Sequence, residues 1–576
     1  MLEDDGVNAE VVSVFPNSVR ISVDDLTTFA AAEDSLKVGS YLKISDNDNV
    51  ALICIIESFS IEVKEISQGD SKRKYIIDAY PLGTLKNGEF HRGGDELAIP
   101  PKKVVPATKA EVESIYAQAF SENKRFTFCS LSKNPAVRVP VDGDRFFNKH
   151  IAIVGATGSG KSHTVSSILQ KALAAKNEGY TGLNNSHVVI FDIHSEYHTA
   201  FPKANLLSAD TITLPYWLLN EEEMEELFLE SGDNNNYNQE SLLRTIITLC
   251  KQRSNPGETK VYFDSPIIYD IGELLNCLQN LARETKDAEN DLHIKTKNEE
   301  KTFSSESEKL SWYCESAKDF ASLERSKINK GAYADGSIDK FVRRIASKVN
   351  NPRLAFIFGH ASQSLAHNSV LEQITGFVQG KESNISIIDL SGIPFEVLSI
   401  TVSLITRILF DFSYYFRRLM AKCDSPLLLV YEEAHKYAPR SDLARYKASL
   451  NAIERIAKEG RKYGTSLLIA SQRPSEISET IFSQCSNFLA MRLTNPDDQA
   501  YVRRLLPDTL GNLTSGISAL ESGDALLIGD STVMPSLVRI DRCNPEPASS
   551  DIQFYEIWKS PWRNIEFGKV ISEWKK

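Results

Sequence analysis

The amino-acid sequence predicts an α/β fold: a parallel β-sheet with helices between its strands, preceded by a small all-β domain and interrupted by a helical insertion. Short apolar runs that end in a glycine or a carboxylate alternate with stretches of helical periodicity. The first part of the chain instead shows short strands separated by turn residues. Apolar strands that alternate with amphipathic helices are typical of a parallel sheet buried on both faces.

The length agrees with several domains. The chain has 576 residues, of which 42% are hydrophobic and 25% charged, and a domain usually takes about 100–200 residues. Changes in pattern divide the chain into an N-terminal β-barrel with a linker (1–130), a first part of the sheet core (131–220), a helical insertion (221–350), a second part of the core (351–545) and a C-terminal tail (546–576).

Charge and cysteine usage restrict the class of protein. The net charge of −12 confines any nucleic-acid contact to a local groove or pore. The eight cysteines include no CxxC pair and the acidic N-terminus is unlike a signal peptide, so we expect no disulfide framework, no zinc and a cytoplasmic protein. The apolar stretch Val397–Phe416 contains Arg407 and Asp411, which favours a buried helix over a membrane span.

The N-terminal segment is predicted to form a small closed or partly open barrel. Residues 9–23 indicate two strands joined by a turn at 16–18, and further strands are expected over 41–44, 50–58, 74–79 and 97–99. No catalytic set of residues is found there, so we favour an assembly platform over a ligand site. A helix over 110–120 leads into the core.

The most specific motif begins at Gly155 and ends in Lys161-Ser162, after the apolar run Ile151–Val154. It matches GxxxxGK[ST], the P-loop, in which backbone N–H groups cradle phosphates at a helix N-terminus. We expect Lys161 to reach the β- and γ-phosphates of ATP and Ser162 to ligate Mg²⁺. The alternative is a glycine-rich surface turn. The nucleotide-binding residues predicted here are Gly155, Thr157, Gly158, Ser159, Gly160, Lys161, Ser162 and His163.

A second apolar strand, 188–191, ends in Asp192. Ligands of parallel sheets bind at the carboxyl ends of strands, so Asp192 and Glu196 are expected to face the nucleotide or a neighbouring subunit. The alternative for Asp192 is an N-cap of the next helix.

The region from about 220 to 350 loses the strand pattern and reads as helices with solvated loops. At its end a basic helix over 341–348 is suited to face DNA, although a solvated charged face explains it equally well. The sheet then resumes with a strand over 385–389.

A second motif is the apolar run 427–430 followed by Tyr431-Glu432-Glu433. A strand that ends in paired carboxylates is a Walker-B arrangement. We assign Glu432 to Mg²⁺ and Glu433 to the water that attacks the γ-phosphate.

A helix over 442–463 and a strand over 466–471 come next, and the strand is followed by Gln472. Gln472 is well placed to sense the γ-phosphate, and an arginine at a subunit edge can stabilise charge that develops in phosphoryl transfer. Arg455, Arg461 and Arg473 compete for this last role.

The order of these motifs resembles the HerA family of hexameric ATPases, relatives of FtsK-type DNA translocases. Besides the P-loop and Walker-B segments, the resemblance includes the segments 191–197, 351–357, 387–390, 459–464, 471–474, 520–528 and 535–539. It implies a RecA-like ATPase core that forms a homo-hexamer, hydrolyses ATP between subunits and moves duplex DNA through the ring pore. It also implies that Arg461 acts in trans as an arginine finger, that Gln472 is the γ-phosphate sensor and that Lys149 approaches a neighbour's nucleotide. Two positions depart from the family: Glu432 stands where aspartate is usual, and position 149 is Lys where some relatives have Arg.

The resemblance further implies a partner protein. Family members typically work with the NurA nuclease in DNA end resection, and some bacterial relatives pair with a nuclease or a sirtuin-like NAD-consuming enzyme in defence against phage. The polar insertion and the N-terminal barrel are the expected docking places.

Three functions follow from the sequence. The first is an ATP-driven DNA translocase, favoured because Lys161, Glu433 and Arg461 are all present. The second is a nucleotide-binding ring that assembles and gates a partner effector with little DNA movement, which suits the acidic composition. The third, a monomeric P-loop kinase or nucleotidase, lacks an acceptor site.

Overall fold

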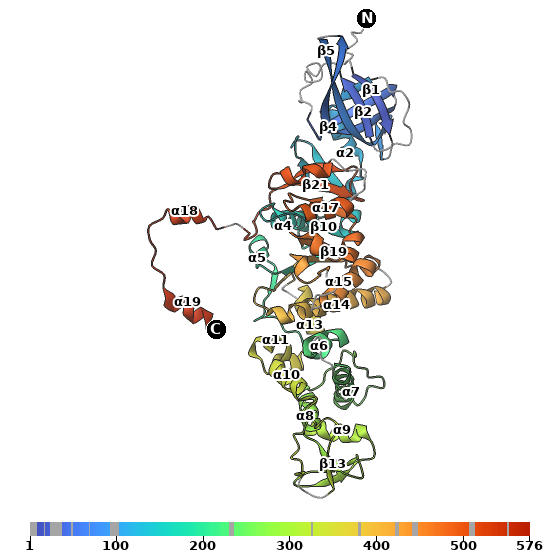
Figure 1. Ribbon diagram of the computed structural model, residues 1–576. Coiled ribbons are helices and arrows are strands. Elements are labelled where there is room, and N and C mark those ends of the chain that lie inside the picture. Colours follow the sequence, from blue (N-terminus) through green and yellow to red (C-terminus); the bar gives the residue numbers. More distant parts are fainter. Residues whose placement is uncertain are drawn as a thin grey trace.

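The computed structural model describes residues 9–15, 18–23, 37–47, 50–67, 70–92, 103–229, 236–323, 327–377, 382–420, 425–440, 447–505, 513–549 and 552–575. The N-terminal β-domain stands at one end of an elongated molecule, the main sheet lies in the middle and the insertion forms the other end (Figure 1). The C-terminal arm, with α18 (Phe554–Trp558) and α19 (Phe567–Trp574), leaves the body from its side.

The core sheet confirms the predicted α/β class. Its order is β12-β17-β11-β18-β19-β10-β20-β21-β22-β8-β9, and the strands from β12 to β20 are parallel while the last four join antiparallel. The strands are β8 (Arg125–Leu131), β9 (Arg138–Asp142), β10 (Ile151–Val154), β11 (His187–Asp192), β12 (Asn205–Leu207), β17 (Ile385–Asp389), β18 (Leu427–Tyr431), β19 (Thr465–Ser471), β20 (Asn487–Ala490), β21 (Asp524–Gly529) and β22 (Ser536–Ile540).

Helices between these strands bury the sheet. They include α4 (Lys161–Ala174), α14 (Phe395–Met420) and α15 (Ala448–Glu459). The helix expected over 442–463 differs in its ends: 441–446 lie outside the described residues, and Gly460–Tyr463 tighten into a 3₁₀ turn. As predicted, α14 buries Val402, Ile405 and Leu409. Among the described residues, no helix combines the length and apolarity needed to cross a bilayer.

The N-terminal domain is antiparallel, as expected, but its recorded pairings follow an open path, β1-β2-β5-β4-β3-β7, with β6 paired to β5. Within the described residues no pairing joins β1 to β7, so closure into a barrel is not confirmed, and the strand expected over 97–99 lies outside these residues. The strands are β1 (Ala9–Phe15), β2 (Ser18–Val23), β3 (Tyr41–Asn47), β4 (Val50–Ser67), β5 (Asp70–Lys86), β6 (Glu89–Arg92) and β7 (Lys103–Pro106). The helix that leads into the core is α2 (Lys109–Gln118), close to its predicted bounds.

The insertion corrects the expectation of helices and loops alone. Its helices are α6 (Glu221–Phe228), α7 (Asn236–Ser254), α8 (Ile271–Leu281), α9 (Glu306–Glu315) and α10 (Asp339–Val349). A four-stranded antiparallel sheet, ordered β15-β14-β13-β16, is also present. The strands are β13 (Thr285–Asp287), β14 (His293–Lys295), β15 (Glu300–Thr302) and β16 (Ile328–Lys330). Three-residue polar strands give no apolar run, so the sequence pattern does not reveal them.

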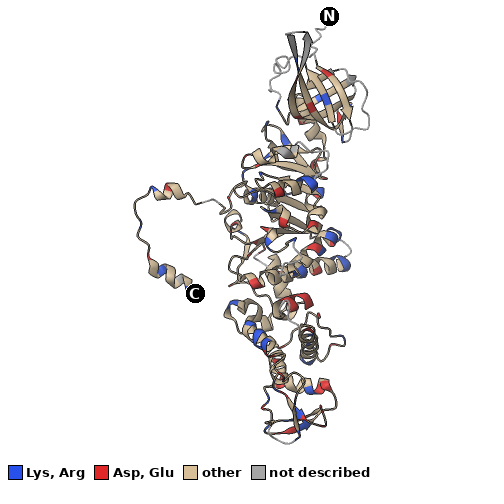
Figure 2. Ribbon diagram, viewed as in Figure 1, with Lys and Arg blue, Asp and Glu red and all other residues tan. Residues whose placement is uncertain are grey.

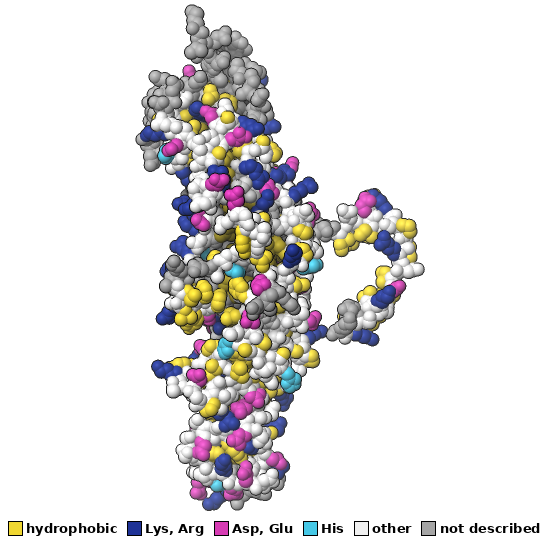
Figure 3. All heavy atoms as spheres, turned by 180° about the vertical axis from the view of Figure 1, so that it is seen from behind, with side chains coloured by type: hydrophobic (Ala, Val, Ile, Leu, Met, Phe, Trp, Pro, Cys, Tyr) yellow, Lys and Arg dark blue, Asp and Glu magenta, His cyan; other side chains and the backbone are white. Residues whose placement is uncertain are grey.

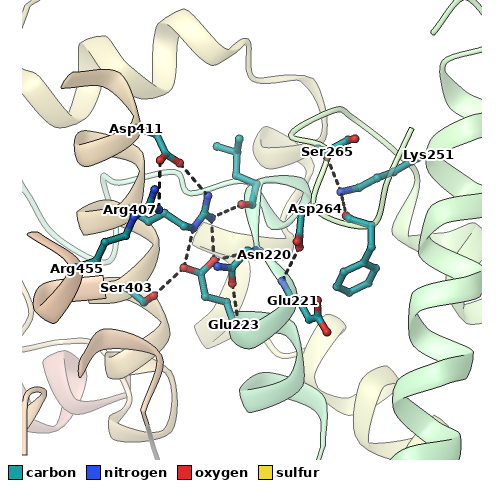
Figure 4. A network of polar contacts seen from close by, with 12 residues as sticks. Asn220, Glu221, Glu223, Lys251, Asp264, Ser265, Ser403, Arg407, Asp411 and Arg455 are labelled. Carbon is teal, nitrogen blue, oxygen red and sulfur yellow. Dashed lines mark hydrogen bonds and ion pairs between the residues drawn. The ribbon is translucent and has the colours of Figure 1, made fainter. Parts of the chain in front are cut away.

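A buried ion pair joins the insertion to the core (Figure 4). Glu223 of α6 is fully buried, and its carboxylate accepts hydrogen bonds from Arg407 of α14 at 2.9 Å and Ser403 at 2.8 Å. Asn220 and Glu223 also form the capping box that starts α6. Because a buried charge is tolerated only when it is paired and hydrogen-bonded, this contact fixes where α6 meets α14.

His150 is a buried neutral imidazole at the start of β10. Its side chain is 2% exposed; Nδ1 accepts the Leu467 N–H at 3.0 Å and Nε2 lies 3.1 Å from the carbonyl oxygen of Ala457, to which it donates. Burial lowers the pKa of His150 to about 4. The unfolded chain therefore binds a proton that the folded chain excludes between about pH 6.5 and 4.

We predict that the wild-type protein loses stability relative to His150→Asn as the pH falls from 7 to 4. A shift from 6.5 to about 4 corresponds to about 3 kcal/mol in the free energy of unfolding. Asparagine tolerates the positive φ of 51° at this position and does not titrate in this range. Denaturant unfolding of both proteins across this range measures the difference. Parallel pH profiles would show that His150 is not held neutral.

Candidate active site

Parallel pairing gathers the sequence motifs at one edge of the sheet. Val154 of β10 lies beside Ser471 of β19, and Tyr431 of β18 lies beside Ile469 of β19. The residues that follow these strands begin the P-loop, the Glu432-Glu433 pair and Gln472. Segments far apart in the chain therefore meet at the carboxyl ends of adjacent strands, where parallel sheets bind ligands.

The P-loop has the backbone of a phosphate cradle. Gly158 and Gly160 adopt φ of 71° and 100°, which favours glycine. A Cβ atom on Gly155 would lie 2.5 Å from Ser159 Oγ and 2.8 Å from Met491 Cβ. Ser159 Oγ is buried with no hydrogen-bond partner in the described structure. Lys161 opens α4, so a phosphate in the cradle would lie at a helix N-terminus.

Lys161 and Glu433 face each other across the cradle. Lys161 Nζ lies 3.8 Å from Glu433 Oε1 and donates to the carbonyl oxygen of Ala156 at 3.5 Å. Burial opposes the ionisation of Glu433, but His435, Lys161 and the Gln472 N–H outweigh it and hold the pKa of Glu433 below its usual range. Glu433 is therefore a carboxylate at neutral pH, able to accept a proton from a water molecule.

Glu432 has the opposite character. It is 4% exposed, and burial together with Asp192 and Glu196 raises its pKa to about 9. Its Oε2 atom is buried without a hydrogen-bond partner among the residues described. A carboxyl group crowded by two other carboxylates, with an oxygen atom that lacks a partner, fits a divalent cation, because Mg²⁺ prefers oxygen ligands. Ser162 is the second residue of α4, directly after Lys161. Burial and the nearby carboxylate of Glu432 raise the pKa of Tyr197 well above its usual value.

Asp192 uses its carboxylate on the backbone. Its two oxygens accept the N–H groups of His194 at 3.2 Å, Glu196 at 3.2 Å and Tyr197 at 2.9 Å. Asp192 is not the N-cap of the next helix, α5 (Tyr197–Ala200), because that position is Glu196. Asp192 shapes the turn after β11 and adds negative charge beside Glu432.

Of the remaining residues predicted at this edge, Gln472 contacts the P-loop and His163 points away from it. Thr157 Oγ1 donates to Gln472 Oε1 at 2.6 Å. His163 instead faces the C-terminal segment, where its ring lies 3.4 Å from Ser549 Oγ and 3.7 Å from Glu546.

Lys149 and Arg461 lie at the opposite edge. Lys149 precedes β10 and forms an ion pair with Asp530 at 2.7 Å. Arg461 precedes β19, is exposed and influences the pKa of His150, which neighbours Lys149. Seven residues of β19 separate the edges by about 20 Å. Neither residue can act on the P-loop of its own chain.

The other two arginine candidates already have partners. Arg455 lies 3.8 Å from Asp411 (Figure 4) and 4.7 Å from the Phe410 ring. Arg473 pairs with Glu476 at 2.7 Å. The side chain of Arg461 is exposed and forms no hydrogen bond or ion pair with the described part of the chain. Of the three, Arg461 is the one without a side-chain partner there.

Sequence reasoning missed Arg492 and His435. The carbonyl oxygen of Arg492 accepts the Ala156 N–H at 2.7 Å, its Nη2 lies 4.0 Å from the position of a Cβ on Gly158, and its Nε is buried without a partner in the described regions. His435 lies 3.3 Å from Glu433 and 3.2 Å from Ser471 Oγ. Arg492 follows β20, the other parallel neighbour of β10. A polar residue after a strand that pairs with the P-loop strand could have been predicted to lie at the nucleotide site.

The chain is similar in sequence to known helicases. Residues 127–409 match the family described as helicase HerA, central domain. A probable helicase of Methanocaldococcus jannaschii is 23% identical over 580 residues, which cover 97% of this chain and 96% of the relative. The DNA double-strand break repair helicase HerA of Saccharolobus solfataricus is 26% identical, covering 82% of this chain and 80% of the relative. Among solved structures, VirB4 of Thermoanaerobacter pseudethanolicus superposes with a TM-score of 0.46 at 12% identity, over 74% of this chain and 98% of that one.

We predict that Arg492→Ala weakens ATP binding about 10-fold or more. A charge-assisted hydrogen bond contributes about 1.5–3 kcal/mol, and Arg492 Nη2 lies 4.0 Å from the position of a Cβ on Gly158 of the P-loop. Titration with a fluorescent ATP analogue measures the dissociation constant. Arg503→Ala, which removes an exposed arginine from α17 (Pro496–Leu505), is the matched control. Equal affinity of both variants would remove Arg492 from the site.

Proposed function

Because the chain belongs to the HerA family and is an ATPase, we propose that it works as a ring-forming motor that couples ATP hydrolysis to the movement of double-stranded DNA. One observation carries the proposal: the groups for binding ATP and activating water lie at one edge of the sheet, while the unpaired Arg461 lies at the other. In a head-to-tail ring the second edge of each subunit faces the first edge of its neighbour.

The chemistry assigned to each residue follows from its surroundings. The P-loop N–H groups, Lys161 and Arg492 hold the phosphates, and Glu433 accepts the proton of the attacking water. Ser162 and Glu432 would hold Mg²⁺, which neutralises phosphate charge when bound. Gln472 accepts a hydrogen bond from Thr157 of the P-loop and directly follows β19, so it would couple the presence of the γ-phosphate to the position of β19.

Assembly into a hexamer is supported by the C-terminal arm. Trp558, Trp562 and Trp574 are 74%, 93% and 85% exposed, and other apolar residues of α18 and α19 are also exposed. Contiguous exposed apolar surface marks an interaction site. Figure 3 shows the arm projecting from the body with its apolar side chains uncovered. A second copy of the chain is the partner we propose for it.

Contact with DNA is assigned to local basic surface. Lys and Arg gather along α10 (Figure 2). Lys340 and Arg343 are exposed there, whereas Arg344 donates to the carbonyl oxygen of Phe228 and Lys348 pairs with Glu396. Only part of this helix is therefore free for phosphates, in keeping with the net charge of −12.

We further propose that the ring acts in the cytoplasm with a partner effector, either a NurA-like nuclease in DNA end processing or a sirtuin-like NADase in phage defence. The N-terminal β-domain and the insertion stand at the two ends of the molecule (Figure 1) and offer separate docking surfaces. The alternative is a ring that mainly gates such an effector. Only the negative net charge of the chain favours it. A water-activating carboxylate such as Glu433 is not required for scaffolding.

We predict that duplex DNA raises the ATPase rate of the assembled protein, whereas Glu433→Gln binds ATP but hydrolyses it about 10²–10⁴-fold more slowly, because general-base catalysis is lost. Lys161→Ala should lose ATP binding itself. Steady-state ATPase assays with no DNA, single-stranded DNA and duplex DNA measure the effect, with Glu433→Gln as the blank. A rate that ignores DNA would contradict the motor and support the gating ring.

We also predict that Arg461→Ala lowers kcat about 10³-fold, as loss of an arginine finger does, with ATP affinity and ring size unchanged. Arg455→Ala is the control because its guanidinium is held by Asp411 and Phe410. ATPase kinetics with light scattering on the same samples test this. If Arg455→Ala lost more kcat than Arg461→Ala, Arg455 rather than Arg461 would be the arginine finger.

A further inference from the structure

Three cysteines from three helices of the insertion converge in its interior. Cys250 of α7, Cys277 of α8 and Cys314 of α9 are each 0% exposed. Cys250 Sγ lies 3.9 Å from Cys314 Sγ, and Cys277 Sγ donates to the carbonyl oxygen of Leu310 at 3.8 Å. Figure 1 places these helices at the end of the molecule opposite the N-terminal domain, far from the P-loop.

A carboxylate completes the cluster. Glu273 lies one helical turn before Cys277 on α8, so both side chains share a face. A carboxylate oxygen of Glu273 and the sulfur atoms of Cys250 and Cys314 all lie within 4.8 Å of one another. Cys277 Sγ does not belong to this set. Three potential ligands, two sulfurs and one oxygen, are thus supplied by three different helices.

We propose that Cys250, Cys314 and Glu273 form a structural zinc site that ties α7, α8 and α9 together. Zinc sites in proteins are tetrahedral with Zn–S bonds of about 2.3 Å, which puts neighbouring sulfurs about 3.8 Å apart, and the Cys250–Cys314 separation is 3.9 Å. Thiolate-rich sites select soft or borderline cations over Mg²⁺ and Ca²⁺. The separation is far longer than a disulfide bond of about 2.05 Å.

The surrounding charges suit a bound cation with this ligand set. Two thiolates and one carboxylate exceed the charge of Zn²⁺ by one. Arg253 donates to both oxygens of Glu273, at 3.2 and 3.3 Å, and also to Ser311. Arg253 thus compensates the excess charge and orients the ligating carboxylate from outside the site.

The site explains how a small polar subdomain keeps its shape. The four strands β13 to β16 are three residues long each and mostly polar, and a metal that links the three neighbouring helices supplies folding free energy directly. The sequence argument against zinc relied on CxxC spacing, whereas here each cysteine comes from a separate helix and the spacing is long.

The test is the metal content of the full chain, purified under reducing conditions and reconstituted with Zn²⁺. Elemental analysis should find one zinc per wild-type chain, none in Cys314→Ser or Cys250→Ser, and one in Cys485→Ser. Cys485 is a suitable control because it is buried elsewhere and donates only to the carbonyl oxygen of Ile481 at 3.5 Å. Replacing zinc by Co²⁺ should give the sulfur-to-cobalt charge-transfer absorption of tetrahedral thiolate coordination.

If the cysteine variants fail to fold, measurements on the wild-type protein are enough to contradict the proposal. A reconstituted wild-type chain that holds no zinc and shows no cobalt–thiolate absorption would mean that the thiols only pack a core. A Cys250–Cys314 disulfide found by mass spectrometry in the reduced preparation, or equal zinc in Cys314→Ser and wild type, would also contradict it. A lower melting temperature after chelation, restored by Zn²⁺, would support it.

Discussion

The parallel pairing of β10 with β19, and of β19 with β18, is the constraint on which the site depends. Val154 lies beside Ser471 and Tyr431 beside Ile469, so the segments that follow these strands meet at one edge. The same pairing sends Lys149 and Arg461, which precede the strands, to the other edge. A single set of strands therefore separates the nucleotide cradle from the arginine that the family resemblance assigns to a neighbouring nucleotide.

Two adjacent carboxylates acquire opposite properties from their surroundings. Glu433, against Lys161 and His435, has a lowered pKa, whereas Glu432, against Asp192 and Glu196, has a pKa raised to about 9. Environments that push the pKa values of neighbouring groups apart separate their chemical roles. Here one carboxylate is ready to accept a proton and the other gains its charge when a cation compensates it.

Local patterns predicted much of the site. The P-loop and the Glu432-Glu433 pair were readable because each couples an apolar strand to an unusual residue set. Their meeting point followed from the rule for parallel sheets. Arg492 and His435 were missed because each is a single polar residue in a loop that follows a strand. Only the order of the strands in the sheet shows that these loops lie beside the P-loop.

The insertion was harder to predict for the same reason. Its polar three-residue strands carry no apolar signal, and its clustered cysteines are separated by whole helices. Two predictions cannot be compared in full with the described residues. One is the closure of the N-terminal sheet, and the other is a helix that begins at residue 442, because residues 441–446 are outside the described ranges. Long-range packing, rather than local propensity, decides all of these features.

Complementation between two inactive chains tests most directly whether the site is shared between subunits. Lys161→Ala lacks its own phosphate-binding lysine, and Arg461→Ala lacks the arginine offered to a neighbour. Each protein alone should be nearly inactive. When they are mixed and allowed to exchange subunits, some interfaces pair an intact Lys161 with an intact Arg461, and ATPase activity should return. Mixed rings that stay inactive would show that both residues act within one chain, contradicting a split active site.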